Sequence, residues 1–173
     1  MPRVLISVGS NLDPERHVLA ALRLLHARLP VVAVSTFYRT PASGRPEQPD
    51  FINGAVEVRT ELPPREIKYG VLRAIEAELG RRRSADAHAP RPIDLDLALY
   101  GDVQVAEEGL VVPDPEIIRR PFLAHPLAEL APELVVPGVG ETLAGIAARL
   151  SREEMQPLPE YTDRVRRELS HEP

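Results

Sequence analysis

Two carboxylates in the segment RPIDLDLALYG, residues 91–101, are the side chains best suited to chemistry. Asp94 and Asp96 lie two positions apart in an apolar run that otherwise has the pattern of a buried strand. Because side chains alternate along a strand, both carboxylates should project from the same face. Two like charges so close destabilise each other unless a positive group lies between them. A divalent cation such as Mg²⁺ can occupy that place.

Basic residues precede this acidic pair. Arg91 and the cluster Arg81–Arg83 lie just upstream. Acids for a metal beside arginines for phosphate oxygens favour a nucleotide site. Plainer interpretations remain open: the acids could be solvated on an edge strand or neutralised by arginines, and loop 81–92 could be an ordinary charged loop. Glu76 could be a third acid near the site or an exposed helix residue.

Composition narrows the class of protein. The 173 residues are 43% hydrophobic and 27% charged, which predicts one globular domain. There is no apolar run long enough for a membrane span, and the N-terminal apolar stretch ends too early for a signal peptide, so a cytoplasmic protein is expected. Without cysteine, disulfides and thiolate sites are excluded. The net charge of −5 argues against nonspecific nucleic-acid binding.

Phosphate-binding loops and zinc motifs are also missing from the sequence. It contains no G-x-x-x-x-G-K-[ST] segment, and its five histidines do not have zinc-site spacing. A bound triphosphate would therefore be held by side chains and metal ions rather than by a backbone loop.

The predicted elements alternate in a recognisable order. Strands are expected at 3–10, 31–40, 51–60 and 93–101, with helices at 11–29 and 61–80. Asp13 should cap the first helix, ahead of Pro14. Val32, Val34, Thr36 and Tyr38 should share one face of the second strand. This order predicts an α+β, ferredoxin-like (βαββαβ) fold, an antiparallel sheet covered by helices.

The rest of the chain adds smaller elements. Residues 41–50 should be a loop, because proline and glycine prevent regular structure there. An extra hairpin should follow Gly101-Asp102, and short C-terminal helices should pack on the core, the last capped by Thr142. The predicted organisation is a single domain at 1–150 and a polar C-terminal tail at 151–173.

Four segments together resemble a known enzyme family. They are VGSN, STFYRTPASG with QPDFINGAVEV, GRRR with APRPIDLDLALYG, and LVVPDPEIIRRPFLAHPLAELAPEL, in order from about residue 4 to residue 145. This combination is similar to 6-hydroxymethyl-7,8-dihydropterin pyrophosphokinases. The resemblance implies a ferredoxin-like fold and an enzyme of folate biosynthesis. Such an enzyme moves the pyrophosphoryl group of ATP to the pterin hydroxymethyl oxygen and releases AMP.

The resemblance also implies roles for individual residues. Asp94 and Asp96 would hold two Mg²⁺ ions that bridge the triphosphate. The catalytic residues implied are Arg81, Arg91, Asp94 and Asp96; those for ATP are Glu76, Arg81, Arg83, Arg91, Asp114 and Arg120; those for the pterin are Thr40, Pro41, Ser43, Phe51, Asn53 and Phe122. Asn53 offers an amide donor and acceptor to the heterocycle edge. Phe51 and Phe122 could sandwich the ring or could be ordinary core residues. The expected partners are ATP and the pterin, without nucleic acid or membrane, and the protein is expected to be a monomer.

The sequence departs from the family pattern in the ATP region. Val112-Pro113-Asp114-Pro115 stands where the family commonly has Val-Pro-His-Pro. An aspartate would repel a triphosphate, so Asp114 should pair with an arginine or sit back from the nucleotide. His88 and Ser84 also lie where some members carry tryptophan and lysine.

Two other functions compete with this one. A ferredoxin-like domain that binds RNA or a regulatory ligand would expose aromatic residues on its sheet. Another Mg²⁺-dependent phosphotransferase would differ only at the pterin-facing residues Phe51, Asn53 and Phe122.

Overall fold

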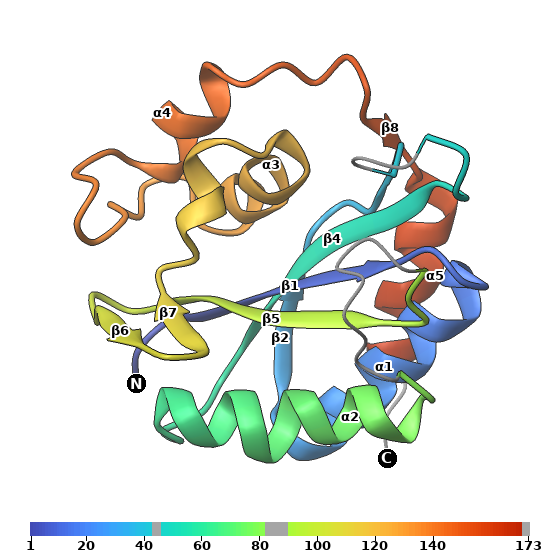
Figure 1. The fold of residues 1–173 in the computed structure, drawn as a ribbon, viewed down its shortest axis with the longest axis horizontal. Coiled ribbons are helices and arrows are strands. Elements are labelled where there is room, and N and C mark those ends of the chain that lie inside the picture. Colours follow the sequence, from blue (N-terminus) through green and yellow to red (C-terminus); the bar gives the residue numbers. More distant parts are fainter. Residues whose placement is uncertain (43–45, 82–89, 171–173) are drawn as a thin grey trace.

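A six-stranded antiparallel sheet forms the centre of the molecule (Figure 1). The computed structural model describes residues 1–42, 46–81 and 90–170. The strands of the sheet are β1 Val4–Ser10, β2 Val31–Val34, β3 Tyr38–Thr40, β4 Phe51–Val58, β5 Asp94–Tyr100 and β8 Gln156–Pro157. Their order is β5-β1-β4, then β2 and β3 along the other edge of β4, and finally β8 beside β3. The predicted ferredoxin-like α+β fold is confirmed.

The second predicted strand is interrupted. Residues 31–40 form β2 and β3, with Ser35 to Phe37 between them. Ser35 replaces regular ladder bonds with its own, since its N–H donates to the Ala55 carbonyl and its hydroxyl accepts from the Ala55 N–H, both at 2.9 Å. The break changes which side chains point inward. Val32 is therefore 45% exposed whereas Tyr38 is 1% exposed, so the prediction that they share one face is wrong.

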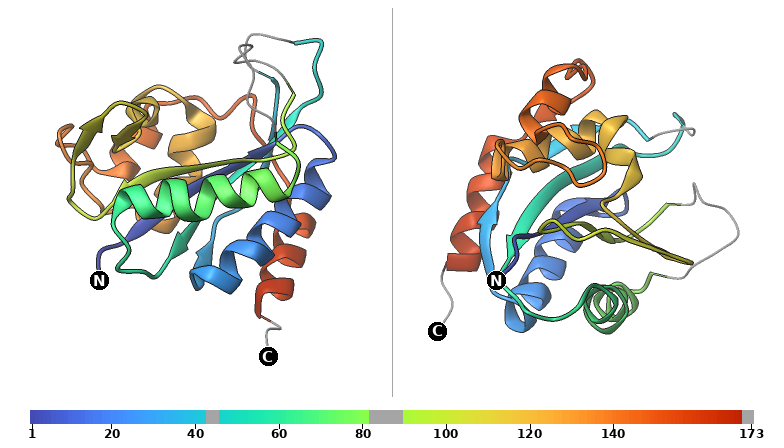
Figure 2. Two further views of the ribbon diagram at one scale, coloured as in Figure 1. Left: turned by 60° about the horizontal axis from the view of Figure 1, so that its bottom comes forward. Right: turned by 90° about the vertical axis from the view of Figure 1, so that its left-hand side faces the viewer.

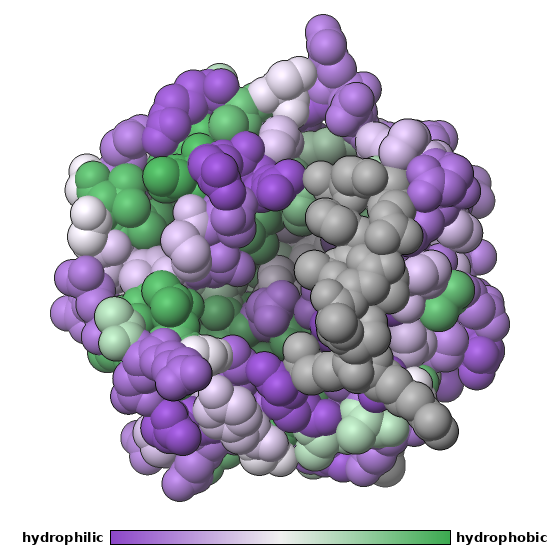
Figure 3. All heavy atoms as spheres, in the orientation of Figure 1, coloured by the Kyte–Doolittle hydropathy of each residue, from purple (hydrophilic) through white to green (hydrophobic). Residues whose placement is uncertain are grey.

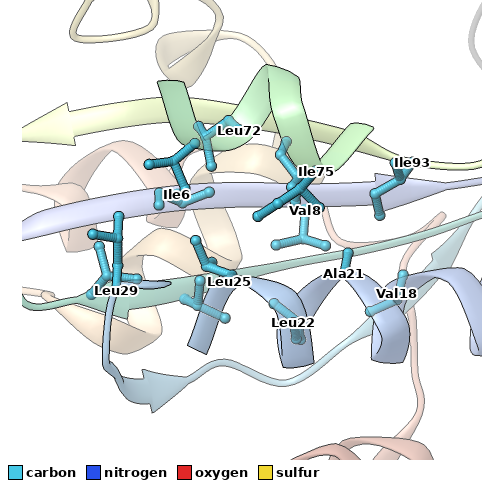
Figure 4. Close-up of a cluster of buried hydrophobic side chains, with 14 of the residues drawn as sticks. Ile6, Val8, Val18, Ala21, Leu22, Leu25, Leu29, Leu72, Ile75 and Ile93 are labelled. Carbon is cyan, nitrogen blue, oxygen red and sulfur yellow. The ribbon is translucent and has the colours of Figure 1, made fainter. Parts of the chain in front are cut away.

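One face of the sheet is covered by the helices α1 Pro14–Arg28, α2 Arg73–Glu78 and α5 Pro159–Ser170, and by the π-helix η1 Glu66–Leu72, which runs directly into α2. Ile6 and Val8 of β1 pack there against Leu22 and Leu25 of α1 (Figure 4). Burial of such side chains stabilises the fold by about 1.5–3 kcal/mol each. The predicted N-cap position of Asp13 ahead of Pro14 is confirmed, although the Asp13 carboxylate accepts from Arg16 at 2.6 Å and not from a helix N–H group.

The opposite face carries a second layer, seen in the right-hand view of Figure 2. It contains the 3₁₀-helix η2 Pro115–Ile118, α3 Pro121–Leu130 and α4 Leu143–Ala148. Leu5, Ala55 and Leu99 of the sheet pack against this layer. Thr142 caps α4 as predicted, its hydroxyl accepting from the Gly145 N–H at 3.1 Å. The predicted extra hairpin is present as β6 Val105–Glu107 and β7 Leu110–Val112.

The prediction of a polar tail from residue 151 is wrong as far as Ser170. β8 pairs with β3, and α5 packs beside α1 and β2. Tyr161, Val165 and Leu169 recur at helical spacing and are buried in the main core. Charged residues dominate the composition of this segment, but they occupy the outer face of an amphipathic helix. In the described part of the chain, no helix has the length and apolar character needed to cross a lipid bilayer.

Candidate active site

A cavity of about 270 Å³ opens at one end of the sheet, on the face that carries α3. The face shown in Figure 3 is hollowed near its centre, where both hydrophilic and hydrophobic residues border the hollow. The floor of the cavity is formed by β1, β4 and β5. Its walls are formed by the loop after β3, by η2 and by the start of α3. The predicted site residues that line it are Thr40, Pro41, Phe51, Asn53, Arg91, Asp94, Asp96, Asp114, Arg120 and Phe122. Segments far apart in the sequence thus meet at one cavity.

The acidic pair projects from β5 into this cavity. Asp94 lies opposite Gly9 of β1, and Asp96 lies opposite Ser7. The intervening Leu95 points to the other face of the sheet, into the main core. The strand alternation expected from the sequence is therefore present, and both carboxyls line the same cavity.

Asp94 is bound by two arginines. Arg81 donates to its Oδ1 at 2.9 Å and Arg91 donates to its Oδ2 at 2.7 Å. Burial alone would raise the pKa of Asp94, but these two guanidinium groups outweigh it and hold that pKa below its ordinary value. Asp94 is therefore ionised in the protein near neutral pH.

Asp96 has the opposite electrostatic environment. Its side chain is exposed to the cavity. Enclosure by the surrounding protein, together with the charges of Asp94 and Asp114, raises the pKa of Asp96 well above its ordinary value. Because the ionised form of Asp96 is repelled by these neighbouring carboxylates, a bound cation would stabilise it.

Glu76 stands behind the cavity rather than in its lining. It is 2% exposed, and its Oε2 accepts from Arg81 at 2.6 Å and from the Leu95 N–H at 2.9 Å. Arg81 is thereby held between Glu76 and Asp94. Glu76 thus holds the arginine that binds Asp94, and its predicted contact with ATP stays a prediction.

Asp114 faces the acidic pair from η2. Its carboxylate accepts from the Glu116 N–H at 2.9 Å and so caps that short helix. Burial raises the pKa of Asp114, although this hydrogen bond opposes the change. Of the two arrangements expected for Asp114, pairing with an arginine is not seen among the described residues; the partner that the structure gives this carboxylate is a backbone N–H.

The other end of the cavity is neutral and partly aromatic. Phe51 and Asn53 project from the same face of β4, and Phe122 lies at the start of α3. The Asn53 amide donates to the Thr40 hydroxyl at 2.7 Å. A side-chain amide and two phenylalanine rings that line one cavity are suited to a flat, polar heterocycle.

Comparison with known proteins identifies the family. Residues 5–132 match the family model for 7,8-dihydro-6-hydroxymethylpterin-pyrophosphokinase (HPPK). The chain belongs to this family. A 2-amino-4-hydroxy-6-hydroxymethyldihydropteridine pyrophosphokinase of Synechocystis sp. is 42% identical over 137 residues, which are 79% of this chain and 68% of the relative. The Methylorubrum extorquens enzyme of the same name is 40% identical over 156 residues, 87% of this chain and 94% of the relative.

A solved structure supports the fold independently. The crystal structure of Plasmodium falciparum HPPK-DHPS superimposes with a TM-score of 0.68 at 12% identity. The match covers 91% of this chain and 47% of the other, so this HPPK-family chain spans about half of that protein. As an HPPK family member, it is a pyrophosphokinase of folate biosynthesis that transfers a pyrophosphoryl group to hydroxymethyldihydropterin.

The sequence analysis did not single out Asn11, which connects Arg91 with Gln48 across the site. Asn11 is 1% exposed; its N–H donates to the Arg91 carbonyl at 3.1 Å, and its Oδ1 accepts from the Arg91 N–H at 2.8 Å. Its Nδ2 donates to Gln48 at 3.2 Å. The usable signal in the sequence was an asparagine directly after a strand that was expected to be buried, because a buried amide needs hydrogen-bond partners for both its oxygen and its nitrogen.

Some predicted positions lie outside the described residues. Ser43 and Arg83, expected to contact pterin and ATP, are among them, and so are Ser84 and His88. Their roles in this HPPK-family chain remain predictions.

Proposed function

We propose that the cavity binds 6-hydroxymethyl-7,8-dihydropterin at its aromatic end and the ATP triphosphate over the acidic pair. One observation carries this assignment: the Asn53 amide, the two phenylalanines and both aspartates line a single cavity. The pterin ring would lie between Phe51 and Phe122, with its edge hydrogen-bonded to Asn53 and Thr40. The hydroxymethyl group would then point towards the phosphates, because β5 brings Asp94 and Asp96 alongside β1 and β4.

Asp94 and Asp96 are suited to hold Mg²⁺. In residues 1–42, 46–81 and 90–170, no group of three or more Asp, Glu, His or Cys side chains is placed to hold a metal ion. The two carboxylates of Asp94 and Asp96 nevertheless fit Mg²⁺, which commonly takes one or two carboxylates and completes its octahedron with water and substrate phosphates. Both oxygens of Asp94 already accept from arginines, yet each retains a second lone pair. We propose two ions, which would supply neutralisation of the triphosphate charge.

The arginines supply the remaining positive charge. Arg91 and Arg120 line the cavity, and Arg81 lies behind Asp94. We assign Arg91, Arg120 and Arg83 to the phosphate oxygens, for which the planar guanidinium is well shaped. Arg81, fixed by Glu76, would orient Asp94. Asp114 would form part of the wall through its cap on η2 and stay out of contact with the phosphates.

The chain's task in the reaction is positioning. The pterin hydroxymethyl oxygen attacks the β-phosphorus, the bond from that phosphorus to the oxygen bridging the α-phosphorus breaks, and AMP leaves while the hydroxyl proton is released. Holding the two substrates in line supplies much of the acceleration in such a transfer. The RNA-binding alternative is disfavoured, since α3 and α4 cover the sheet face that would serve as its platform.

The test is AMP release from ATP, with and without the pterin, in Mg²⁺ and in EDTA. We expect AMP only when pterin and Mg²⁺ are both present. Asp96→Asn should lose activity by at least about a hundredfold. Asp102→Asn, in the exposed turn after the same strand, is the matched control and should keep wild-type activity. AMP release that persists in Asp96→Asn, or that ignores the pterin, would exclude the assignment.

A further inference from the structure

The C-terminal segment 152–162 contacts the shortest strand of the site. β3 has three residues and lies between β4 and β8, so β8 forms its outer neighbour. Tyr38 of β3 pairs with Pro157, and Arg39 pairs with Gln156. Three residues make few ladder bonds, and such a strand depends on its neighbours for a fixed position.

The same segment also provides hydrogen-bond partners for the backbone of Phe37, in the break between β2 and β3. Phe37, just before β3, donates its N–H to the Thr162 hydroxyl at 2.9 Å and accepts from the Leu158 N–H at 2.8 Å. Its ring meets Tyr161 edge to face, with centroids 5.9 Å apart. Both backbone groups of a fully buried residue are thus held by residues 158–162.

A third contact fixes β3 from the opposite face. The Tyr38 hydroxyl donates to Glu129 at 2.9 Å and accepts from Arg152 at 3.0 Å, and the guanidinium lies 5.7 Å from the ring centroid. Glu129 also accepts from the Thr36 N–H at 2.6 Å. These hydrogen bonds involve charged groups, which makes them stronger than neutral ones.

The position of β3 decides the geometry of the neutral end of the cavity. Tyr38 pairs with Asn53, and Thr40 pairs with Phe51. Thr40 accepts from the Asn53 amide at 2.7 Å. If β3 shifts, Asn53 loses the partner that orients its amide. The acidic pair would be unaffected, because β5 lies on the far side of β1 from β4.

We infer that residues 152–162 hold β3 in place and thereby set the affinity for the pterin, with Thr162 and Arg152 as positioning residues. This segment follows residues 5–132, the part of the chain that matches the family model. The inference rests on the proposed function, which places the pterin against Asn53 and Thr40. It assigns a substrate-specific effect to side chains that do not line the cavity.

The test compares Thr162→Val with Thr162→Ser. Valine keeps the shape but removes the acceptor for Phe37, whereas serine retains a hydroxyl. We expect the KM for the pterin to rise about three- to tenfold in Thr162→Val, the range of one weakened contact. The KM for ATP should stay within about twofold, and Thr162→Ser should resemble wild type. Should Thr162→Val fail to fold, Arg152→Ala with Arg149→Ala as its control makes the same comparison. Equal changes in both KM values, or an unchanged pterin KM in a folded variant, would overturn the inference.

Asn53→Ala separates this inference from the proposed function beneath it. If Asn53→Ala leaves the KM for the pterin unchanged, the pterin is bound elsewhere and the proposed function fails. If Asn53→Ala raises that KM while Thr162→Val and Arg152→Ala do not, only the role of the C-terminal segment is refuted.

Discussion

Asp94 and Asp96 project side by side from β5, yet their pKa values are shifted in opposite directions. Two arginines hold the pKa of Asp94 below its ordinary value, despite burial that acts to raise it. Burial and the neighbouring carboxylates raise the pKa of Asp96 well above its ordinary value. One member of the pair is thus stabilised as an anion by the protein itself. The other is left to be stabilised by what binds in the cavity.

Removing the charge of Asp96 should make the protein more stable. A carboxyl whose pKa is raised on folding binds its proton more tightly in the folded state, so its ionisation at neutral pH lowers the free energy of unfolding. We expect Asp96→Asn to gain on the order of 1 kcal/mol at pH 7 in denaturant titrations. The gain should shrink as the pH falls through the raised pKa, because the wild-type group then becomes neutral.

Asp94→Asn is the companion variant and should do the reverse. It leaves Arg81 and Arg91 facing a neutral amide, at a cost of about 1–3 kcal/mol. Equal effects of the two substitutions would contradict the electrostatic difference between the two aspartates.

Magnesium should stabilise the protein more strongly as the pH rises. Mg²⁺ requires the ionised form of Asp96 and competes with the proton that its raised pKa retains. The increase in Tm caused by Mg²⁺ should therefore be large at a pH of about 8 and nearly absent at a pH of about 4, near the ordinary carboxyl pKa. Thermal unfolding with and without Mg²⁺ at each pH measures this increase in Tm. Asp96→Asn should show little increase at either pH, and a pH-independent increase in wild type would count against this site.

The acidic pair was predictable from sequence because a strand has a fixed period of two. Its electrostatic asymmetry was not, since Arg81 reaches Asp94 from thirteen residues away only after η1 and α2 have packed on the sheet. Glu76 shows the same limit. The place of Glu76 on a helix was predictable. Its burial was not, because it depends on the neighbouring strand, where the Leu95 N–H donates to the Glu76 carboxylate.

The C-terminal segment could not be assigned from its composition. Residues 151–170 are rich in charge and interrupted by proline, which is typical of a tail. Tyr161, Val165 and Leu169 nevertheless form a buried stripe on a helix that packs beside α1 and β2. Tyr161 meets Phe37 in the break between β2 and β3. That break was also missed, because Val31 to Thr40 has continuous strand propensity, and only the ladder with β4 shows where pairing ends.

Asn11 should couple the two sides of the site. Asn11→Ala removes its bond to the Arg91 N–H as well as its bond to Gln48. We expect both the pterin KM and the ATP KM to rise, with a loss of about 1–2 kcal/mol in stability from the unsatisfied buried groups. Gln48→Ala leaves the Asn11 acceptor for Arg91 in place and removes one partner of the Asn11 amide, so its ATP KM should remain near that of wild type. Steady-state kinetics with each substrate varied in turn distinguish the two variants, and identical behaviour would argue against this division of roles.

Gly9 should control the pterin end of the cavity through Asn53. A Cβ on Gly9 would lie 2.6 Å from Oδ1 of Asn53, much closer than van der Waals contact. Because that oxygen is the far end of a flexible side chain, Gly9→Ala should be relieved by rotation of the amide and leave the fold intact. The rotation would break the bond to Thr40 and turn the amide away from the cavity.

Gly9→Ala should therefore raise the pterin KM by about tenfold or more while changing the ATP KM little. Gly70→Ala is the matched control, since a Cβ there meets nothing within 4 Å, and it should leave both constants unchanged. Isothermal titration with the pterin in the presence of a non-hydrolysable ATP analogue would check the affinity directly. An unaltered pterin affinity in folded Gly9→Ala would mean that the orientation of the Asn53 amide does not govern recognition, and the hydrogen bonds to the heterocycle would then have to come from other residues.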